Sequence, residues 1–147
     1  MGAGYSPFAP GTAGSLVALI IYWLLPEITI FIWLCAIVCI FFIGVCTATA
    51  TEKEQIEKIG YERGHDPAIV VIDEFVGMLI ALVAIPHTKY FMIPAFIIFR
   101  LFDIVKPFPI NISQKLPRGW GVMIDDVIAG IYTNILIQIF LLVRHNF

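Results

Sequence analysis

An unbroken apolar run over residues 28–46 limits the fold more than any other feature of the sequence. A helix of about 20 apolar residues can cross the hydrocarbon core of a bilayer, where every backbone polar group must find its partner inside the protein. Of the 147 residues, 60% are hydrophobic and 14% are charged, whereas about a quarter of a soluble domain is charged. The sequence therefore predicts an all-α, polytopic helical membrane protein with a single domain over residues 1–147.

Four further apolar segments bring the expected number of hydrophobic helices to about five. They cover residues 15–25, 68–85, 91–105 and 121–143. The first is too short to cross a bilayer even when it is counted from Thr12, so we expect a short or re-entrant helix. Residues 1–14 are rich in Gly and Pro, which predicts an irregular N-terminal arm. Thr12 and Ser15 both suit the N-cap of the helix that follows.

Two polar connections, residues 47–67 and 106–120, set the predicted orientation. In the first, Thr51 and Glu54 match a capping box, which predicts a short amphipathic helix on the surface. Cytoplasmic loops of membrane proteins carry an excess of Lys and Arg. The two connections contain Lys53, Lys58, Arg63, Lys106, Lys115 and Arg118, against Lys89 and Arg144 on the other side. We therefore expect both connections, and the N-terminal arm, to face the cytoplasm.

Charged residues lie where the apolar segments meet this cytoplasmic side. A carboxylate within a membrane span costs about 2.5–3.5 kcal/mol to insert, so it usually has a function. The predicted topology brings four separated polar groups to one depth, which scattered charges would not do. The groups are Thr12 with Ser15, Asp73 with Glu74, Arg100 with Asp103 and Lys106, and Asp125 with Asp126.

The composition of this cluster favours a hard metal ion. It contains five carboxylates and two cations, an excess of three negative charges, and like charges so close must protonate unless a cation joins them. Oxygen ligands beside a phosphate are typical of Mg²⁺. Zinc is disfavoured because no histidine lies in the cluster, although His65 lies in a loop that can reach it. The predicted ligands are Asp73, Glu74, Asp103 and one of Asp125 or Asp126.

Several roles within the cluster stay open at this stage. Neighbouring residues of a helix point about 100° apart, so only one carboxylate of each adjacent pair need touch the metal. Arg100 and Lys106 can clamp a phosphate or merely stabilise their helix through Asp103. Thr12 and Ser15 can cap a helix or help its N-terminus to bind phosphate. The small residues Gly77 with Ala81 and Ala129 with Gly130 indicate close helix packing.

A phosphate and Mg²⁺ site at the lipid boundary suits a phospholipid substrate, whose acyl chains stay in the bilayer. A transporter of divalent cations is one alternative, but it should hold its carboxylates near the midplane with access from both sides. Another phospholipid phosphotransferase is the nearer alternative, although the chain lacks an Asp-Gly-x2-Ala-Arg pattern. The net charge of −2 argues against nucleic acid as a partner.

Four motifs contain the polar residues of the cluster. They are Pro-Gly-Thr-Ala-Gly-Ser-Leu over residues 10–16, Asp-Glu-Phe-Val-Gly-Met over 73–78, Arg-Leu-Phe-Asp-Ile-Val-Lys-Pro-Phe-Pro-Ile over 100–110 and Gly-Trp-Gly-Val-Met-Ile-Asp-Asp-Val-Ile-Ala-Gly over 119–130. In these motifs and their order the chain resembles the phosphatidylglycerophosphatase A family of bacterial membrane enzymes. The chain before the first motif is short for the family.

The resemblance implies removal of the terminal phosphate of phosphatidylglycerophosphate, with Mg²⁺ as cofactor, at the cytoplasmic face of the bacterial inner membrane. It implies catalytic roles for Asp73, Glu74, Asp103, Asp125 and Asp126. Arg100, Lys106, Thr12 and Ser15 would contact the substrate phosphate. Both attack by water, with a carboxylate as general base, and an aspartyl-phosphate intermediate fit these residues.

Overall fold

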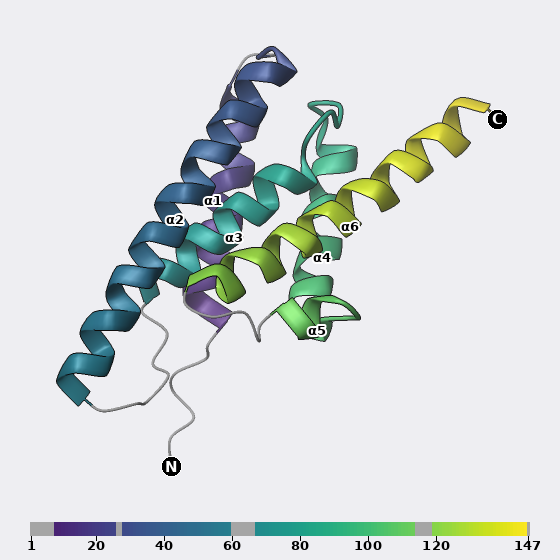
Figure 1. Cartoon of the computed structure of the whole chain (residues 1–147). Coiled ribbons are helices and arrows are strands. Elements are labelled where there is room, and N and C mark those ends of the chain that lie inside the picture. The colour runs from purple at the N-terminus through teal and green to yellow at the C-terminus, as the bar shows by residue number, and fades with distance from the viewer. Residues whose placement is uncertain (1–7, 26–27, 60–66, 114–118, 147) are drawn as a thin grey trace.

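The computed structural model describes residues 8–25, 28–59, 67–113 and 119–146, and in these ranges all the regular structure is helical, which confirms the predicted class (Figure 1). Five long helices alternate in direction, and a single helical turn, α5, lies within the connection predicted over residues 106–120. The helices are α1 (Phe8–Leu24), α2 (Ile30–Ile59), α3 (Pro67–Ala81), α4 (Lys89–Val105), α5 (Ile110–Ser113) and α6 (Gly119–Asn146).

The shortest of the long helices, α3, lies at the centre of the bundle, where it contacts α1, α2, α4 and α6. It runs in the same direction as α6 (Figure 1). The two backbones approach at Gly77 and Gly130, where a Cβ on Gly130 would collide with the carbonyl oxygen of Gly77. The predicted close packing at this pair is confirmed, because only glycine permits such a backbone approach.

The distribution of polarity is the reverse of that in a water-soluble protein. Large apolar side chains point outward along the bundle: Trp23, Phe31 and Tyr90 are 67%, 71% and 76% exposed. Soluble monomers rarely expose large contiguous apolar patches. The polar side chains Ser15, Asp73, Glu74, Asp125, Asp126 and Thr133 are instead buried. A lipid environment accounts for both observations, since it solvates apolar groups and excludes charges.

Two helical stretches in the described ranges are long and apolar enough to cross a membrane, residues 30–51 of α2 and residues 119–145 of α6. With 17 residues, α1 is as short as predicted. Helices α3 and α4, with 15 and 17 residues, are short as well. At about 1.5 Å per residue they extend over less than the roughly 30 Å hydrocarbon core.

Two predictions about helix ends are wrong. First, the short amphipathic helix predicted from Thr51 is not a separate element, because α2 continues without a break through residues 51–59. Thr51 does not begin a helix; its hydroxyl donates to the carbonyl of Thr47, one turn earlier (3.0 Å). Such a bond places the threonine inside a helix, where the capping-box pattern has no effect.

Second, α1 begins at Phe8, so residues 8–14, predicted as part of an irregular arm, are helical. Pro10 is compatible with this start because a proline is tolerated in the first turn of a helix, where the N–H groups have no intrahelical partner. Thr12 and Ser15 therefore lie inside α1 rather than at its N-cap.

Candidate active site

Polar residues from α1, α3, α4 and α6 meet at one end of the bundle. At this end α1, α3 and α6 begin and α4 ends (Figure 1). The gathering predicted from the topology is thus present in the structure. Five of its side chains are buried: Ser15, Asp73, Glu74, Asp125 and Asp126. Arg100 and Asp103 are slightly more open, with 13% and 15% of their side chains exposed, and Lys106 is 30% exposed.

Glu74 receives donors from two other helices. The Ser15 hydroxyl of α1 donates to Oε2 of Glu74 (2.8 Å), and Arg100 of α4 donates to the same oxygen through Nη1. The approach of α1 depends on Gly14, since a Cβ at this position would collide with the carbonyl oxygen of Val71 in α3. Three helices are therefore joined at one carboxylate oxygen.

Asp103 connects this group to a second ion pair. Arg100 Nη1 lies 3.0 Å from Asp103 Oδ2, and Lys106 Nζ lies 4.0 Å from Asp103 Oδ1. Lys106 donates its stronger hydrogen bond to Oδ2 of Asp125, at 2.8 Å. The two cations and three carboxylates, from α3, α6 and the last turn of α4, thus form one network.

Lys106 both ends α4 and contributes a positive charge to this network. Lys106 ends α4 in the left-handed conformation (φ 46°), and its N–H donates to the carbonyl of Phe102. Burial lowers the pKa of Lys106, but the hydrogen bond to Asp125 and the negative charges of Asp125 and Asp103 outweigh it, so the pKa is raised above its usual value. Lys106 therefore stays charged at neutral pH.

The remaining acids, Asp73 and Asp126, have no ion pair with a Lys or Arg side chain among the described residues. Each lies four residues before a glycine of the close contact between α3 and α6, Gly77 or Gly130. Asp126 interacts electrostatically most with Asp73 and then with Asp103, Asp125 and Glu74. The two aspartates therefore lie on the two helices of the α3–α6 contact, and no described Lys or Arg side chain pairs with either.

The structure thus distinguishes the two members of each adjacent acid pair, whose separate roles the sequence did not determine. In the first pair Glu74 holds Arg100, and in the second Asp125 holds Lys106. Oδ1 of Asp73 accepts from the N–H of Glu74 (2.8 Å), and Oδ1 of Asp125 accepts from the N–H of Asp126 (3.1 Å). Neighbouring carboxylates of one helix consequently point toward different partners.

No three His, Cys, Asp or Glu side chains of the described residues are arranged closely enough to hold a metal ion jointly. The ion pairs give the reason, because they draw Glu74 toward Arg100 and Asp125 toward Lys106. The donor set nevertheless fits Mg²⁺: two buried carboxylates lack a cation, the cluster has three excess negative charges, and every ligand atom is a hard oxygen. Two further predicted residues remain. Thr12 is half-buried in α1, and His65 lies outside the described residues.

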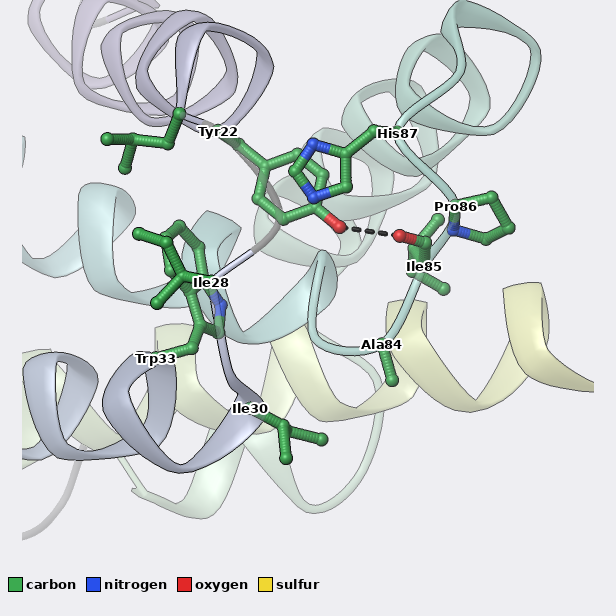
Figure 2. Close-up of a pocket in the computed structure, with 9 residues that line it drawn as sticks. Tyr22, Ile28, Ile30, Trp33, Ala84, Ile85, Pro86 and His87 are labelled. Atoms are coloured by element: carbon green, nitrogen blue, oxygen red, sulfur yellow. Dashed lines mark hydrogen bonds between the residues drawn. The ribbon is translucent and has the colours of Figure 1, made fainter.

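A cavity of about 370 Å³ lies at the opposite end of the bundle, away from the acids (Figure 2). There Tyr22 donates to the carbonyl of Ile85 (2.5 Å) and stacks on His87 (4.0 Å between ring centroids). These residues have no distinctive signal in the sequence, because lone aromatic residues in apolar segments follow no characteristic spacing. The described lining residues are mostly apolar and include no acid, which distinguishes this cavity from the charged cluster.

The fold and the cluster define a helical protein with an apolar exterior and a buried charged site at one end. Comparison with known proteins identifies its family: residues 1–141 match the family model described as phosphatidylglycerophosphatase A. The chain belongs to this family, which makes it a phosphatase. No solved structure matches the chain.

The chain aligns with three relatives over most of the length of each. A Bacteroides thetaiotaomicron protein, whose name describes a phosphatidylinositol-3-phosphatase, is 44% identical, over 94% of this chain and 87% of its own. Phosphatidylglycerophosphatase A of Haemophilus influenzae is 40% identical, over 92% of this chain and 81% of its own. The Escherichia coli protein of the same name is 37% identical, over 88% of this chain and 73% of its own.

Proposed function

We propose that the protein hydrolyses the terminal phosphate monoester of phosphatidylglycerophosphate, which yields phosphatidylglycerol and inorganic phosphate. The observation that carries this proposal is the largely buried cluster of five carboxylates and two cations at one end of a bundle with an apolar exterior. A lipid with a phosphorylated head group matches both parts, since its acyl chains suit the exterior and its phosphate suits the cations. The family membership and the two relatives named for this activity support the same substrate.

The proposed setting is the bacterial cytoplasmic membrane, with several helices embedded and the charged site facing the cytoplasm. The exposed apolar residues of α1, α2, α4 and α6 support embedding of the whole bundle. The excess of Lys and Arg in the connections at the charged end supports the orientation. A phosphate on a lipid of the inner leaflet would then reach the site without crossing the membrane.

Asp73 and Asp126 are the proposed carboxylate ligands of Mg²⁺, because they are the buried acids without a cationic partner among the described residues. Asp103, predicted as a third ligand, already contacts Arg100 and Lys106 and is the nearest further candidate. Bound Mg²⁺ would neutralise charge on the phosphate oxygens and lower the pKa of a bound water.

Arg100 and Lys106 would bind and orient the substrate phosphate. A guanidinium has five N–H donors in a planar fork, and the two closest contacts of Arg100 to carboxylates both use Nη1. The other edge is suited to a phosphate, which guanidinium groups bind in a bidentate manner. Lys106, with 30% of its side chain exposed, would supply a second positive charge from the rim of the site. A carboxylate of the cluster would take the proton of the attacking water.

The identity of the head group needs a direct comparison, because the Bacteroides relative is named for phosphatidylinositol 3-phosphate. We expect purified protein in detergent with phospholipid to release phosphate from phosphatidylglycerophosphate at least about tenfold faster than from phosphatidylinositol 3-phosphate. The reverse order would assign the protein to the inositol lipid. No release from either lipid would contradict the proposed function.

The metal site is tested with Asp73→Asn and Asp126→Asn, which keep the size of each side chain and remove its charge. Loss of a group that stabilises the transition state typically costs about 10²–10³ in kcat, and we expect at least a loss of that order for each variant. Chelation by EDTA should abolish phosphate release, and Mg²⁺ should restore it. Rates near wild type in both variants would contradict the role of the two aspartates.

A further inference from the structure

Ser15 raises a question that the family resemblance does not answer. The resemblance implies a contact between Ser15 and the substrate phosphate, yet the Ser15 side chain is fully buried (0% exposed). A serine hydroxyl has a single hydrogen, and in Ser15 it is donated to Oε2 of Glu74. The same oxygen accepts from Arg100. The hydroxyl thus lies behind the carboxylate that holds the arginine.

We propose that Ser15 is a positioning residue, which acts through Glu74 to fix the guanidinium of Arg100 and does not itself contact the phosphate. The inference rests on the proposed function, since it takes Arg100 to be the phosphate ligand. Helix α1 then contributes to the site by orienting a cation that α4 supplies. Glu74, predicted from the sequence as a metal ligand, becomes the link between the two.

The geometry explains why this link needs a donor on α1. A glutamate carboxylate rotates freely about its last bond unless hydrogen bonds fix it. Two donors from opposite helices on one oxygen restrict this rotation, and so fix the direction in which Glu74 attracts Arg100. A long Arg side chain loses much rotamer freedom when it is held in place. Holding it before the substrate arrives reduces the entropy that phosphate binding must overcome.

The contact itself is built into the packing of α1 on α3. Gly14, the residue before Ser15, permits the backbone of α1 to lie against Val71 of α3. Val71 in turn lies three residues before Glu74. At this distance a short side chain is sufficient to reach the carboxylate. A serine in the middle of a helix is otherwise a weak helix former with no advantage over alanine.

The test is a double-mutant cycle on the affinity for inorganic phosphate, measured with purified protein in detergent at saturating Mg²⁺. Ser15→Ala removes the donor without changing a charge. Loss of a hydrogen bond to a charged group typically corresponds to about 10–100-fold in an equilibrium constant, and we expect a loss of phosphate affinity at the lower end. In the Glu74→Gln background, Ser15→Ala should change the affinity by less than about twofold, because the link is already broken. The affinity for Mg²⁺ should stay unchanged in Ser15→Ala.

Kinetics give an independent readout that a merely structural role would not produce. Ser15→Ala should raise KM for the lipid substrate by about the same factor as the phosphate dissociation constant, with kcat within about twofold. Thr133→Val is the matched control: Thr133 is also fully buried, and its hydroxyl bonds the carbonyl of Ala129 in its own helix (2.9 Å). This control should leave both the phosphate affinity and KM unchanged. Should Ser15→Ala fail to fold, Ser15→Cys, with its much weaker donor, should weaken phosphate binding in the same way.

Three outcomes would overturn the inference. Equal losses from Ser15→Ala with and without Glu74→Gln would indicate a direct contact between Ser15 and phosphate. An unchanged phosphate affinity in Ser15→Ala, with only a lower unfolding temperature, would indicate a structural role. A loss of Mg²⁺ affinity would place Ser15 with the metal instead. An Arg100→Gln variant that binds phosphate normally would contradict the phosphate site of the proposed function itself, which is a separate failure.

Discussion

The two ends of the helix bundle both contain polar side chains in apolar surroundings, but these side chains bind different partners. At the charged end, side chains pair with side chains: Ser15 and Arg100 with Glu74, and Lys106 with Asp125. At the opposite end, side chains pair with backbone carbonyls. Asn134 of α6 donates to the carbonyls of Ala81 and Val83 (3.1 and 2.7 Å) and Gln138 to that of Ala84 (3.3 Å).

The difference distinguishes polar side chains that stabilise the fold from polar side chains that form a candidate site. The last four carbonyls of a helix have no intrahelical donor, and Asn134 supplies one to Ala81, the last residue of α3. In the turn that follows α3, Asn134, Gln138 and Tyr22 donate to further carbonyls. The requirement at that end is thereby met by neutral groups. At the charged end no helix terminus requires five carboxylates, and pairing leaves an excess of negative charge. A buried excess of charge is costly, which is the mark of a site that receives a ligand.

The strongest test of this comparison disturbs the contact that joins α3 to α6. In Gly130→Ala the new Cβ would collide with the carbonyl oxygen of Gly77, so the helices must separate. We expect the free energy of unfolding in detergent to fall by about 3 kcal/mol, near the upper limit for overpacking. Phosphate release should fall as well, because Asp73 and Asp126 lie one turn from this contact.

Gly44→Ala is the matched control for this substitution. Its Cβ would meet the end of the Met123 side chain (Cε at 2.6 Å), which can rotate away, instead of a backbone atom. The cost should therefore be much smaller, and activity should be kept. Similar losses in both variants would indicate that general crowding, and not the α3–α6 contact, controls the site.

A smaller effect is expected from Lys106→Gln, which removes the charged donor of the hydrogen bond to Oδ2 of Asp125. Hydrogen bonds to charged groups contribute about 1.5–3 kcal/mol, and the partial exposure of Lys106 favours the lower value. Because the pKa of Lys106 is raised in the folded protein, its contribution is complete below the unfolded pKa of about 10.4 and is lost as the pH rises through the folded value. The stability difference from wild type should therefore be constant between pH 6 and 9 and shrink only above about pH 10.4.

Urea unfolding followed by circular dichroism across this pH range measures the difference. Lys89→Gln, an exposed lysine at the start of the same helix, is the control and should have little effect at any pH. A difference that changes strongly near pH 7 would show that an acid of the cluster, and not Lys106, titrates in this range.

The sequence predicted the long helices and the gathering of the charged residues, since both follow from the order of apolar and polar segments. It did not predict the partners within the cluster. The Ser15–Glu74 bond joins residues 59 positions apart, so it depends on how closely two helices pack, which no local pattern encodes. The same limit applies to the different roles of Asp73 and Glu74, because the partners of Glu74 come from other helices.

Short sequence patterns gave wrong helix ends where a helix continued through them. The pair of Thr51 and Glu54 has the spacing of a capping box, but the preceding helix continues through it because nothing interrupts the helix between Cys46 and Thr51. A cap forms only where a helix must begin. The predicted start of α1 is too late for a related reason. Pro10 is typical of an irregular segment, but it also fits the first turn of a helix.

The smallest expected effect belongs to Tyr22→Phe at the opposite end, which removes the hydroxyl that donates to the carbonyl of Ile85. A hydrogen bond of this kind contributes about 1 kcal/mol, and the ring can keep its stacking on His87 (Figure 2). We expect a slightly lower unfolding temperature, with phosphate release and KM unchanged, because no acid or cation of the charged end contacts this tyrosine's cavity. A clear loss of activity without a loss of stability would break the distinction between the ends, since polarity at the neutral end would then serve the reaction and not only the termination of α3.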